Sequence, residues 1–131
     1  MRLYKAVVLC CVTGALLGAC ARRMAPVAES ADPYYEPPPV VLEVSNNHWN
    51  DVVIYVMRGG QRVRVMTIVA INSQSVIVPK HLLGPGGELR VLAYPIGGYQ
   101  RYLSPRVYAQ PGTTIAVTLE TDLRRSSVSV W

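Results

Sequence analysis

Residues 52–65 read VVIYVMRGGQRVRV, and this stretch carries the clearest structural signal in the chain. The unbroken apolar run Val52–Met57 indicates a strand that is covered on both faces. Residues 58–61 (RGGQ) are typical of a tight hairpin turn, because glycine adopts the positive φ values that such a turn needs. Residues 62–65 alternate arginine with valine, which predicts a second strand with its arginines toward solvent and its valines toward a core. The stretch therefore predicts a β-hairpin.

Short β-type segments of the same kind continue on both sides of this hairpin, separated by turn residues. Gln110-Pro111-Gly112-Thr113, for example, has the Pro-Gly pair of a type II turn. Seven or eight strands in residues 40–131 predict an all-β fold, a small antiparallel two-sheet β-sandwich of immunoglobulin-like type. A small closed barrel is the alternative. A short helical turn is expected within 78–84, and the further strands are expected at 40–44, 75–78, 88–94, 99–108, 114–120 and 127–131.

The last two segments make specific predictions about side-chain direction. Ile115, Val117 and Leu119 alternate with polar or small residues and should face the core. Trp131 ends the chain and is expected to cap the core. Outer-membrane barrels also end in an aromatic residue, but their strands need about 9–11 residues, and most segments here are shorter.

The N-terminus has the build of an export signal. Arg2 and Lys5 precede an uncharged stretch, residues 6–19, which matches the basic and apolar regions of a signal peptide. A short uncleaved membrane anchor is the alternative. However, a spanning helix needs about 20 apolar residues, and Arg22 and Arg23 close the stretch early.

Residues 17–20 read Leu-Gly-Ala-Cys and resemble the bacterial lipobox. The resemblance implies that the Cys20 thiol receives a diacylglycerol, that residues 1–19 are removed and that the new amino group is acylated. Ala21 stands where an Asp would resemble the inner-membrane retention signal. The resemblance therefore implies the outer membrane, and the periplasmic face is expected. Cys10 and Cys11 would leave with the signal, so no thiol would remain for a disulfide, a metal or a nucleophile.

The region after the lipobox is rich in proline. Residues 21–39 hold five of the ten prolines and few large aliphatic residues. Such a composition favours an extended tether, which at about 3.1 Å per residue reaches at most about 60 Å. The expected organisation is a signal peptide at 1–19, a lipidated Cys20 with a linker to residue 39, and a β-sandwich domain at 40–131.

Length and charge exclude several classes of function. A chain of 131 residues has room for one modest domain and not for an enzyme with its own cofactor domain. Removal of residues 1–19 leaves 11 basic and 8 acidic side chains. This slight excess, in an exported protein, argues against nucleic acid as a partner.

Candidate catalytic and metal-binding residues are few. Ser45, His48 and Asp51 lie close together in sequence, but they fall in one turn, where Ser and Asp bond to nearby backbone. Triads draw their members from separate elements, so no catalytic residue is predicted. His48 and His81 are the two histidines, and the Asn/Asp-rich residues 46–51 lack the spacing of a calcium loop. Neither a metal nor a cofactor is therefore predicted.

Two sets of residues are candidates for binding. The first is Arg58, Arg62 and Arg64 of the hairpin. Arg62 and Arg64 project from one face by the two-residue period of a strand. Guanidinium groups pair with phosphate or carboxylate, so lipopolysaccharide and peptidoglycan are candidate ligands. The alternative is a solvated strand face whose charges discourage edge-to-edge pairing.

The second set surrounds Gly97-Gly98 and is rich in tyrosine. Such a set suits contacts with protein or glycan. The alternative is that tyrosine fills the core, because the chain has no Phe. The members of this set are Tyr94, Tyr99, Arg101, Tyr102 and Tyr108.

Residues 46–131, with the run DVVIYVMRGGQR at 51–62, are similar to small bacterial lipoproteins with an all-β domain. The resemblance implies a fold and a location but no activity. The leading hypothesis is a non-enzymatic envelope lipoprotein whose tethered sandwich binds an envelope protein partner. The alternative is a module that binds glycan or lipopolysaccharide through the arginines, and an enzyme or a hydrolase accessory is a third hypothesis.

Overall fold

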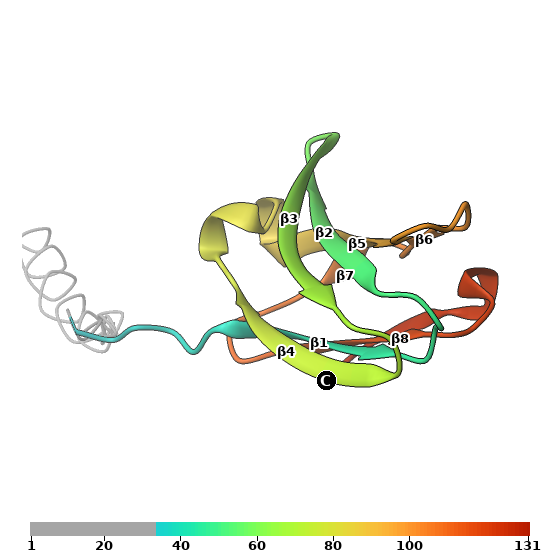
Figure 1. Ribbon diagram of the computed structural model, residues 1–131. Coiled ribbons are helices and arrows are strands. Elements are labelled where there is room, and N and C mark those ends of the chain that lie inside the picture. The colour runs from blue at the N-terminus through green and yellow to red at the C-terminus, as the bar shows by residue number, and fades with distance from the viewer. Residues whose placement is uncertain (1–33) are drawn as a thin grey trace, which may run out of the picture. The chain divides into compact units, whose positions relative to one another are not determined.

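The computed structural model describes residues 34–131, and Glu36–Trp131 form one compact unit (Figure 1). The predicted signal peptide, Cys20 and the linker up to residue 33 lie outside the described residues. Within the described part no helix is long and apolar enough to cross a membrane. The strands are β1 (Val40–Asn46), β2 (Val52–Arg58), β3 (Gln61–Ile68), β4 (Asn72–Val78), β5 (Glu88–Pro95), β6 (Tyr102–Leu103), β7 (Val107–Tyr108), β8 (Thr114–Leu119) and β9 (Ser127–Val130). Three single-turn 3₁₀ helices are η1 (Lys80–Leu82), η2 (Pro85–Gly87) and η3 (Leu123–Arg125).

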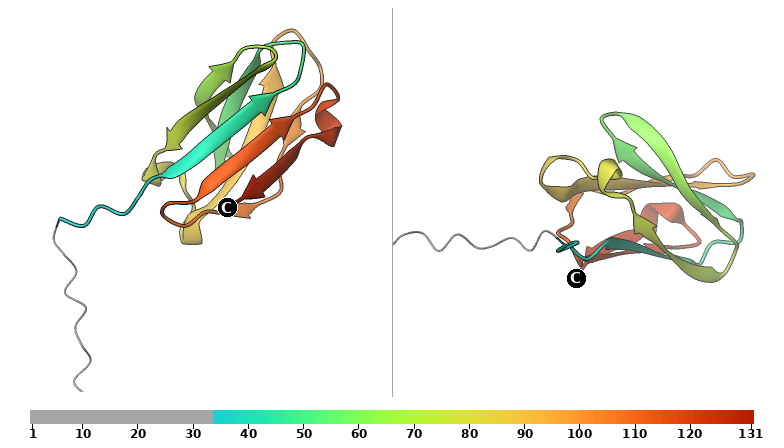
Figure 2. Two further views of the ribbon diagram at one scale, coloured as in Figure 1. Left: turned by 90° about the horizontal axis from the view of Figure 1, so that it is seen from below. Right: turned by 90° about the vertical axis from the view of Figure 1, so that its left-hand side faces the viewer.

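The strands form two sheets that pack face to face (Figure 2). Sheet A has the order β4-β1-β8-β9, and sheet B has the order β3-β2-β5-β6, with β7 also paired to β5. All pairs are antiparallel except β1 with β8, which run parallel. The predicted all-β, immunoglobulin-like two-sheet sandwich is thus confirmed, as is the short helical turn expected within 78–84.

The core is built from alternate residues of the two sheets. In β1, β2, β5 and β8 every second side chain is buried, including the predicted Ile115, Val117 and Leu119. Full burial of one such aliphatic side chain contributes about 1.5–3 kcal/mol. The central core side chains of these strands are Leu42, Val44, Val52, Ile54, Val56, Leu89, Val91, Ile115, Val117 and Leu119.

The prediction that β2 is covered on both faces is wrong. Val52, Ile54 and Val56 are fully buried, whereas Val53, Tyr55 and Met57 are only half-buried. The latter three face outward, and among residues 34–131 no third sheet or helical layer packs on that side of sheet B. Neighbouring side chains of the same sheet shield them in part, so a continuous apolar run here marks a one-sided strand.

The hairpin between β2 and β3 forms as predicted. Gly59 and Gly60 have φ values of 53° and 83°, as a turn with two central positive φ values requires. Arg62 and Arg64 are exposed as expected, but Val63 is also exposed. The reason is that the hairpin projects away from sheet A (Figure 1), so its outermost valine has no opposing core.

Residues 99–108, predicted as one strand, form two pairs of residues, β6 and β7. The buried Ser104 separates them: its Oγ accepts the N–H of Val91 at 2.8 Å and donates to the Pro105 carbonyl oxygen at 2.8 Å. Pro105 has no N–H to offer a ladder. The Ser104 N–H still donates to the Val91 carbonyl oxygen at 2.9 Å, but the Val91 N–H bonds to a side chain and not to a ladder carbonyl, and regular pairing stops there.

Trp131 does not cap the core as predicted, because its side chain is 68% exposed. The backbone of Trp131 pairs with Thr114, with N–H···O distances of 2.8 and 3.0 Å. That register places Trp131 on the same face as Thr114, one residue out of phase with the inward-facing Ile115.

Candidate functional site

The outer face of sheet B gathers four arginines, which we call the cationic face: Arg62, Arg64, Arg90 and Arg101. Register explains the first three. Met57 of β2 pairs with Arg62 on one side and with Arg90 on the other. Tyr55, one step along the same face, pairs with Arg64. Arg101 approaches from the loop between β5 and β6.

Apolar side chains lie between these cations. Tyr55 pairs with Leu92, and Leu92 pairs with Leu103, so the three form a row across β2, β5 and β6. The guanidinium carbon of Arg62 lies 5.7 Å from the centre of the Tyr55 ring, within the range of a cation–π interaction. The face therefore alternates charge with apolar surface.

None of the four arginines makes an ion pair within residues 34–131. Arg64 Nη2 donates to Thr67 Oγ1 at 2.5 Å, and Arg90 Nε donates to the Ser104 carbonyl oxygen at 3.1 Å. Glu88 lies two residues before Arg90 on the same face of β5, but its carboxylate pairs with Arg106 at 3.3 Å. The cationic face consequently carries positive charge that no carboxylate in this part of the chain neutralises.

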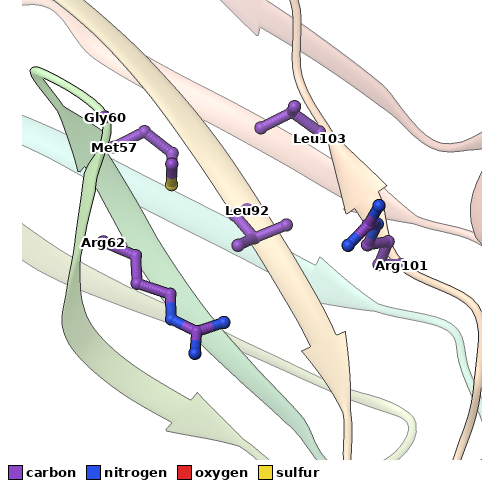
Figure 3. A pocket seen from close by; sticks show the side chains of 6 residues that line it. All are labelled: Met57, Gly60, Arg62, Leu92, Arg101 and Leu103. Carbon is purple, nitrogen blue, oxygen red and sulfur yellow. The ribbon is translucent and has the colours of Figure 1, made fainter.

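A hollow of about 420 Å³ lies on this face, open to solvent (Figure 3). Arg62 and Arg101 lie on either side of Leu92 in this view. The sequence placed these two arginines in separate candidate sets, and the sheet brings them to one hollow. The lining side chains are Met57, Gly60, Arg62, Leu92, Arg101 and Leu103.

Arg58 is not part of this face. In the alternation of β2 it falls on the same side as the inward-facing Val52, Ile54 and Val56. Its Nη1 donates to the carbonyl oxygen of His81. The bond ties the end of β2 to η1, which is a structural role. Of the predicted set, only Arg62 and Arg64 share the outer face.

The tyrosine-rich set is also divided by the structure. Tyr102 is buried in the core, and this burial raises the pKa of its phenol. Tyr99 is fully exposed in the loop between β5 and β6, while Tyr94 lies on the outer face of sheet B. The core alternative thus holds for Tyr102, and Tyr99 and Arg101 remain accessible to a partner.

Ser45, His48 and Asp51 do not contact one another as a nucleophile and its base would. Ser45 Oγ lies 2.9 Å from Ser73 Oγ, His48 Nδ1 accepts the N–H of Asn50 at 3.0 Å, and Asp51 Oδ1 accepts the N–H of Ala70 at 2.9 Å. Only the His48 bond is local to the turn. Ser45 lies at the end of β1 and not in the turn as predicted, and it bonds across to β4, while Asp51 bonds to the loop between β3 and β4. In residues 34–131 no three or more His, Cys, Asp or Glu side chains gather in a way that could hold a metal ion.

The sequence analysis did not single out Arg90, Leu92 and Leu103, which the structure places on the outer face of sheet B beside the predicted arginines. A signal was present for the first two, because Glu88, Arg90, Leu92 and Tyr94 alternate with the buried Leu89, Val91 and Ala93. Leu103 gave no such signal, since β6 is only two residues long.

Comparison with known proteins gives a weak likeness in fold. No family model matches the chain, and no curated protein matches it. A solved structure titled "NMR structure of the protein from Eubacterium rectale" aligns with a TM-score of 0.42 and 15% identity, over 70% of this chain and 87% of that one. A "Crystal Structure of Gram Negative Toxin" aligns with a TM-score of 0.38 and 14% identity, over 73% of this chain and 23% of that one.

Proposed function

We propose that the protein is a lipid-anchored lipoprotein of the bacterial outer membrane whose β-sandwich is a non-enzymatic binding module. The lipobox at residues 17–20 supports the anchor, through Cys20. The module would hold an anionic component of the envelope against the cationic face. Lipopolysaccharide phosphates and peptidoglycan carboxylates are the candidate anions.

The observation that carries this proposal is a set of four arginines on one sheet face that make no ion pair with any residue of 34–131. Guanidinium groups bind phosphate and carboxylate through two parallel N–H···O bonds. Arg62 of β3 and Arg101 of the loop before β6 line one hollow, so an anionic ligand that enters the hollow can meet both. Met57, Leu92 and Leu103 add an apolar floor that favours an amphiphilic anion over a small ion.

The exposure of these arginines sets the expected character of binding. Charges at a solvated surface interact over about 10 Å at 0.1 M salt and less as salt rises. Binding through the cationic face should therefore weaken steeply with ionic strength. The apolar floor should leave a residual, salt-independent part.

A protein partner is the second candidate for the same face. Tyr55 lies beside Arg62 and Arg64 on it, and Tyr94 lies on the same face of sheet B, on β5. Tyrosine and arginine are enriched at the energetic centres of protein interfaces. A protein partner would use these side chains together with the hollow.

The test compares two double variants of equal charge. Arg62→Ser with Arg101→Ser removes two cations from the hollow, and Arg124→Ser with Arg125→Ser removes two from η3. Cosedimentation with purified peptidoglycan and retention on immobilised lipopolysaccharide are measured for both. Loss in the first variant only is the expected result. An equal loss of binding in both double variants would show that net charge alone controls binding, and it would contradict the proposal.

A protein partner would give a different pattern. Crosslinking in intact envelopes, read by mass spectrometry, would then trap one dominant protein that the Arg62/Arg101 variant loses. Retention on the two purified anions would stay the same in both variants.

A further inference from the structure

Three loops at one end of the sandwich expose large apolar side chains. They are residues 47–51 between β1 and β2, residues 69–71 between β3 and β4, and residues 96–101 between β5 and β6. Figure 1 shows them at the end opposite to the start of β1. We call their exposed apolar side chains the apolar tip: Trp49, Val69, Ile71, Ile96 and Tyr99.

Hydrogen bonds lock these loops to one another. The fully buried Asn46 donates from Nδ2 to the carbonyl oxygens of Asn50 at 3.1 Å and Val69 at 3.0 Å. Asp51 links the other two loops: its Oδ1 accepts the N–H of Ala70 at 2.9 Å, and its carbonyl oxygen accepts the N–H of Ile96 at 2.8 Å. The tip is therefore displayed on a fixed frame and is not exposed by a loose loop.

Backbone strain points to the same end of the molecule. Ile71 has a φ of +52°, a conformation that β-branched residues rarely adopt, and its side chain is 63% exposed. Such a residue costs about 1–3 kcal/mol. Since exposure gives the isoleucine little burial to offset this cost, stability does not explain its presence. Residues held under strain cluster at functional sites.

The tip is uncharged, unlike the cationic face. Residues 47–50, 69–71 and 96–100 contain no Asp, Glu, Lys or Arg. The carboxylate of Asp51 is engaged by Ala70 N–H. Arg101, the next residue of the third loop, belongs to the cationic face. The five side chains of the tip are themselves uncharged, and their chemistry favours an apolar medium.

We propose that the apolar tip inserts into the boundary between the headgroups and the acyl chains of a lipid bilayer. Trp and Tyr concentrate at that boundary, where their rings meet both water and hydrocarbon. The side chains of the tip come from three loops at one end of the domain, and a bilayer accepts such an end without a complementary pocket.

The segment between Cys20 and the domain is long enough for the tip to meet the same bilayer that holds the lipid. This part of the inference rests on the proposed lipid at Cys20. Residues 21–35 span up to about 50 Å when extended, while the seven residues of β1 measure about 23 Å. The chain is thus long enough to let the tip turn back to the membrane that holds the lipid, so that the tip orients the domain on its surface.

The experiment uses the two tryptophans as matched probes. Trp49 is at the tip and Trp131 is at the end of β9, and their exposures are similar, 72% and 68%. Trp131→Phe leaves Trp49 as the sole tryptophan, and Trp49→Phe leaves Trp131. The full-length lipidated protein is reconstituted into phosphatidylcholine vesicles in which part of the lipid carries bromine on the upper acyl chain.

The expected result is a blue-shifted emission and strong bromine quenching for Trp49, with neither for Trp131. Both effects should persist in high salt, because the tip is uncharged. Equal emission and equal quenching of the two tryptophans would overturn the inference. Ile71→Asn should reduce the quenching of Trp49 while the protein remains folded.

The experiment distinguishes an error in the inference about the tip from an error in the proposed function. The Arg62→Ser/Arg101→Ser variant should leave the quenching of Trp49 unchanged, since these vesicles carry no net charge. Flotation of the vesicles reports the lipid anchor, and quenching reports the tip. If the chain carries no lipid, adding the same vesicles to the water-soluble protein still decides the matter: quenching of Trp49 supports insertion, and its absence overturns it.

Discussion

Asn46 and Val69 are joined across the two sheets by a hydrogen bond of 3.0 Å from Asn46 Nδ2 to the Val69 carbonyl oxygen. Asn46 ends β1 in sheet A, and Val69 follows β3 in sheet B. The same side chain also bonds to the Asn50 carbonyl oxygen and to His48 N–H. One buried amide thus holds together the loops that carry the apolar tip.

Asn46→Ala should therefore destabilise the fold strongly. It leaves two carbonyl oxygens and one N–H without their partner, and each buried unsatisfied group costs about 1–3 kcal/mol. We expect a loss of about 3 kcal/mol in the free energy of unfolding, measured by urea denaturation. The exposed neighbour Asn47→Ala is the control, expected within about 0.5 kcal/mol of wild type. Equal effects of the two changes would contradict the role given to Asn46.

Two effects of adding a side chain, backbone strain and a steric clash, can be measured separately at Gly86 and Gly87. Both have positive φ, 69° and 80°, but only at Gly87 would a Cβ meet another atom, the Ala109 carbonyl oxygen at 2.0 Å. Gly87→Ala should cost the strain of about 1–2 kcal/mol and also about 1–3 kcal/mol for overpacking. Gly86→Ala should cost the strain alone. Thermal unfolding of both variants measures the difference, and equal melting temperatures would refute the close approach.

Ile71→Asn should raise the stability of the protein. Asn adopts the left-handed conformation several times more readily than most residues, so the change relieves the strain at φ +52°. We expect a gain of about 1 kcal/mol, which for a domain of this size raises the melting temperature by about 4–8 °C. Ile77→Asn is the control, because Ile77 is a similarly exposed isoleucine within β4. Scanning calorimetry that shows no gain for Ile71→Asn would remove the strain argument.

Acid should weaken the η3 region through Asp122. Hydrogen bonds from Arg124 hold the pKa of Asp122 below its usual value of 3.8. A carboxyl whose pKa is lowered on folding stabilises the protein above its unfolded-state pKa, and this contribution is lost as pH falls through the folded-state pKa. The loss is therefore expected below about pH 4. It should be small, because the group is exposed.

The measurement is the melting temperature of wild type and Asp122→Asn as a function of pH. The variant should be less stable at neutral pH and should lose less on acidification. Arg124→Gln, which removes the largest cause of the pKa shift, should behave alike. Parallel curves for wild type and both variants would count against this linkage.

Cys20→Ser should release the protein from the envelope membrane. Each buried methylene of an acyl chain contributes about 0.8 kcal/mol, and two or more chains hold a protein firmly. Fractionation should move the variant to the soluble periplasmic fraction. Intact-mass measurement of the wild type should show acyl groups at Cys20 and the loss of residues 1–19, and an unmodified sulfur would refute the anchor.

Local sequence signals predicted most of the individual elements. The RGGQ turn, the alternation at 114–119 and the Pro-Gly turn act within a few residues, so their outcome depends little on distant parts of the chain. Predictions that needed a distant partner failed. Trp131 was expected in the core, but its register with Thr114 turns it outward, and residues 99–108 divide because Ser104 bonds to Val91 on another strand.

The sequence by itself determined that residues 40–131 form an all-β sandwich, because hydrophobic alternation and turn chemistry are local properties of a chain. Only the tertiary structure decided that Arg62 and Arg101 line one hollow and that Arg58 does not join them. It also decided that Trp49 and Ile71 share one end of the molecule. Strand order and register are set by which apolar faces pack together across the whole domain, and no short stretch of sequence contains that information.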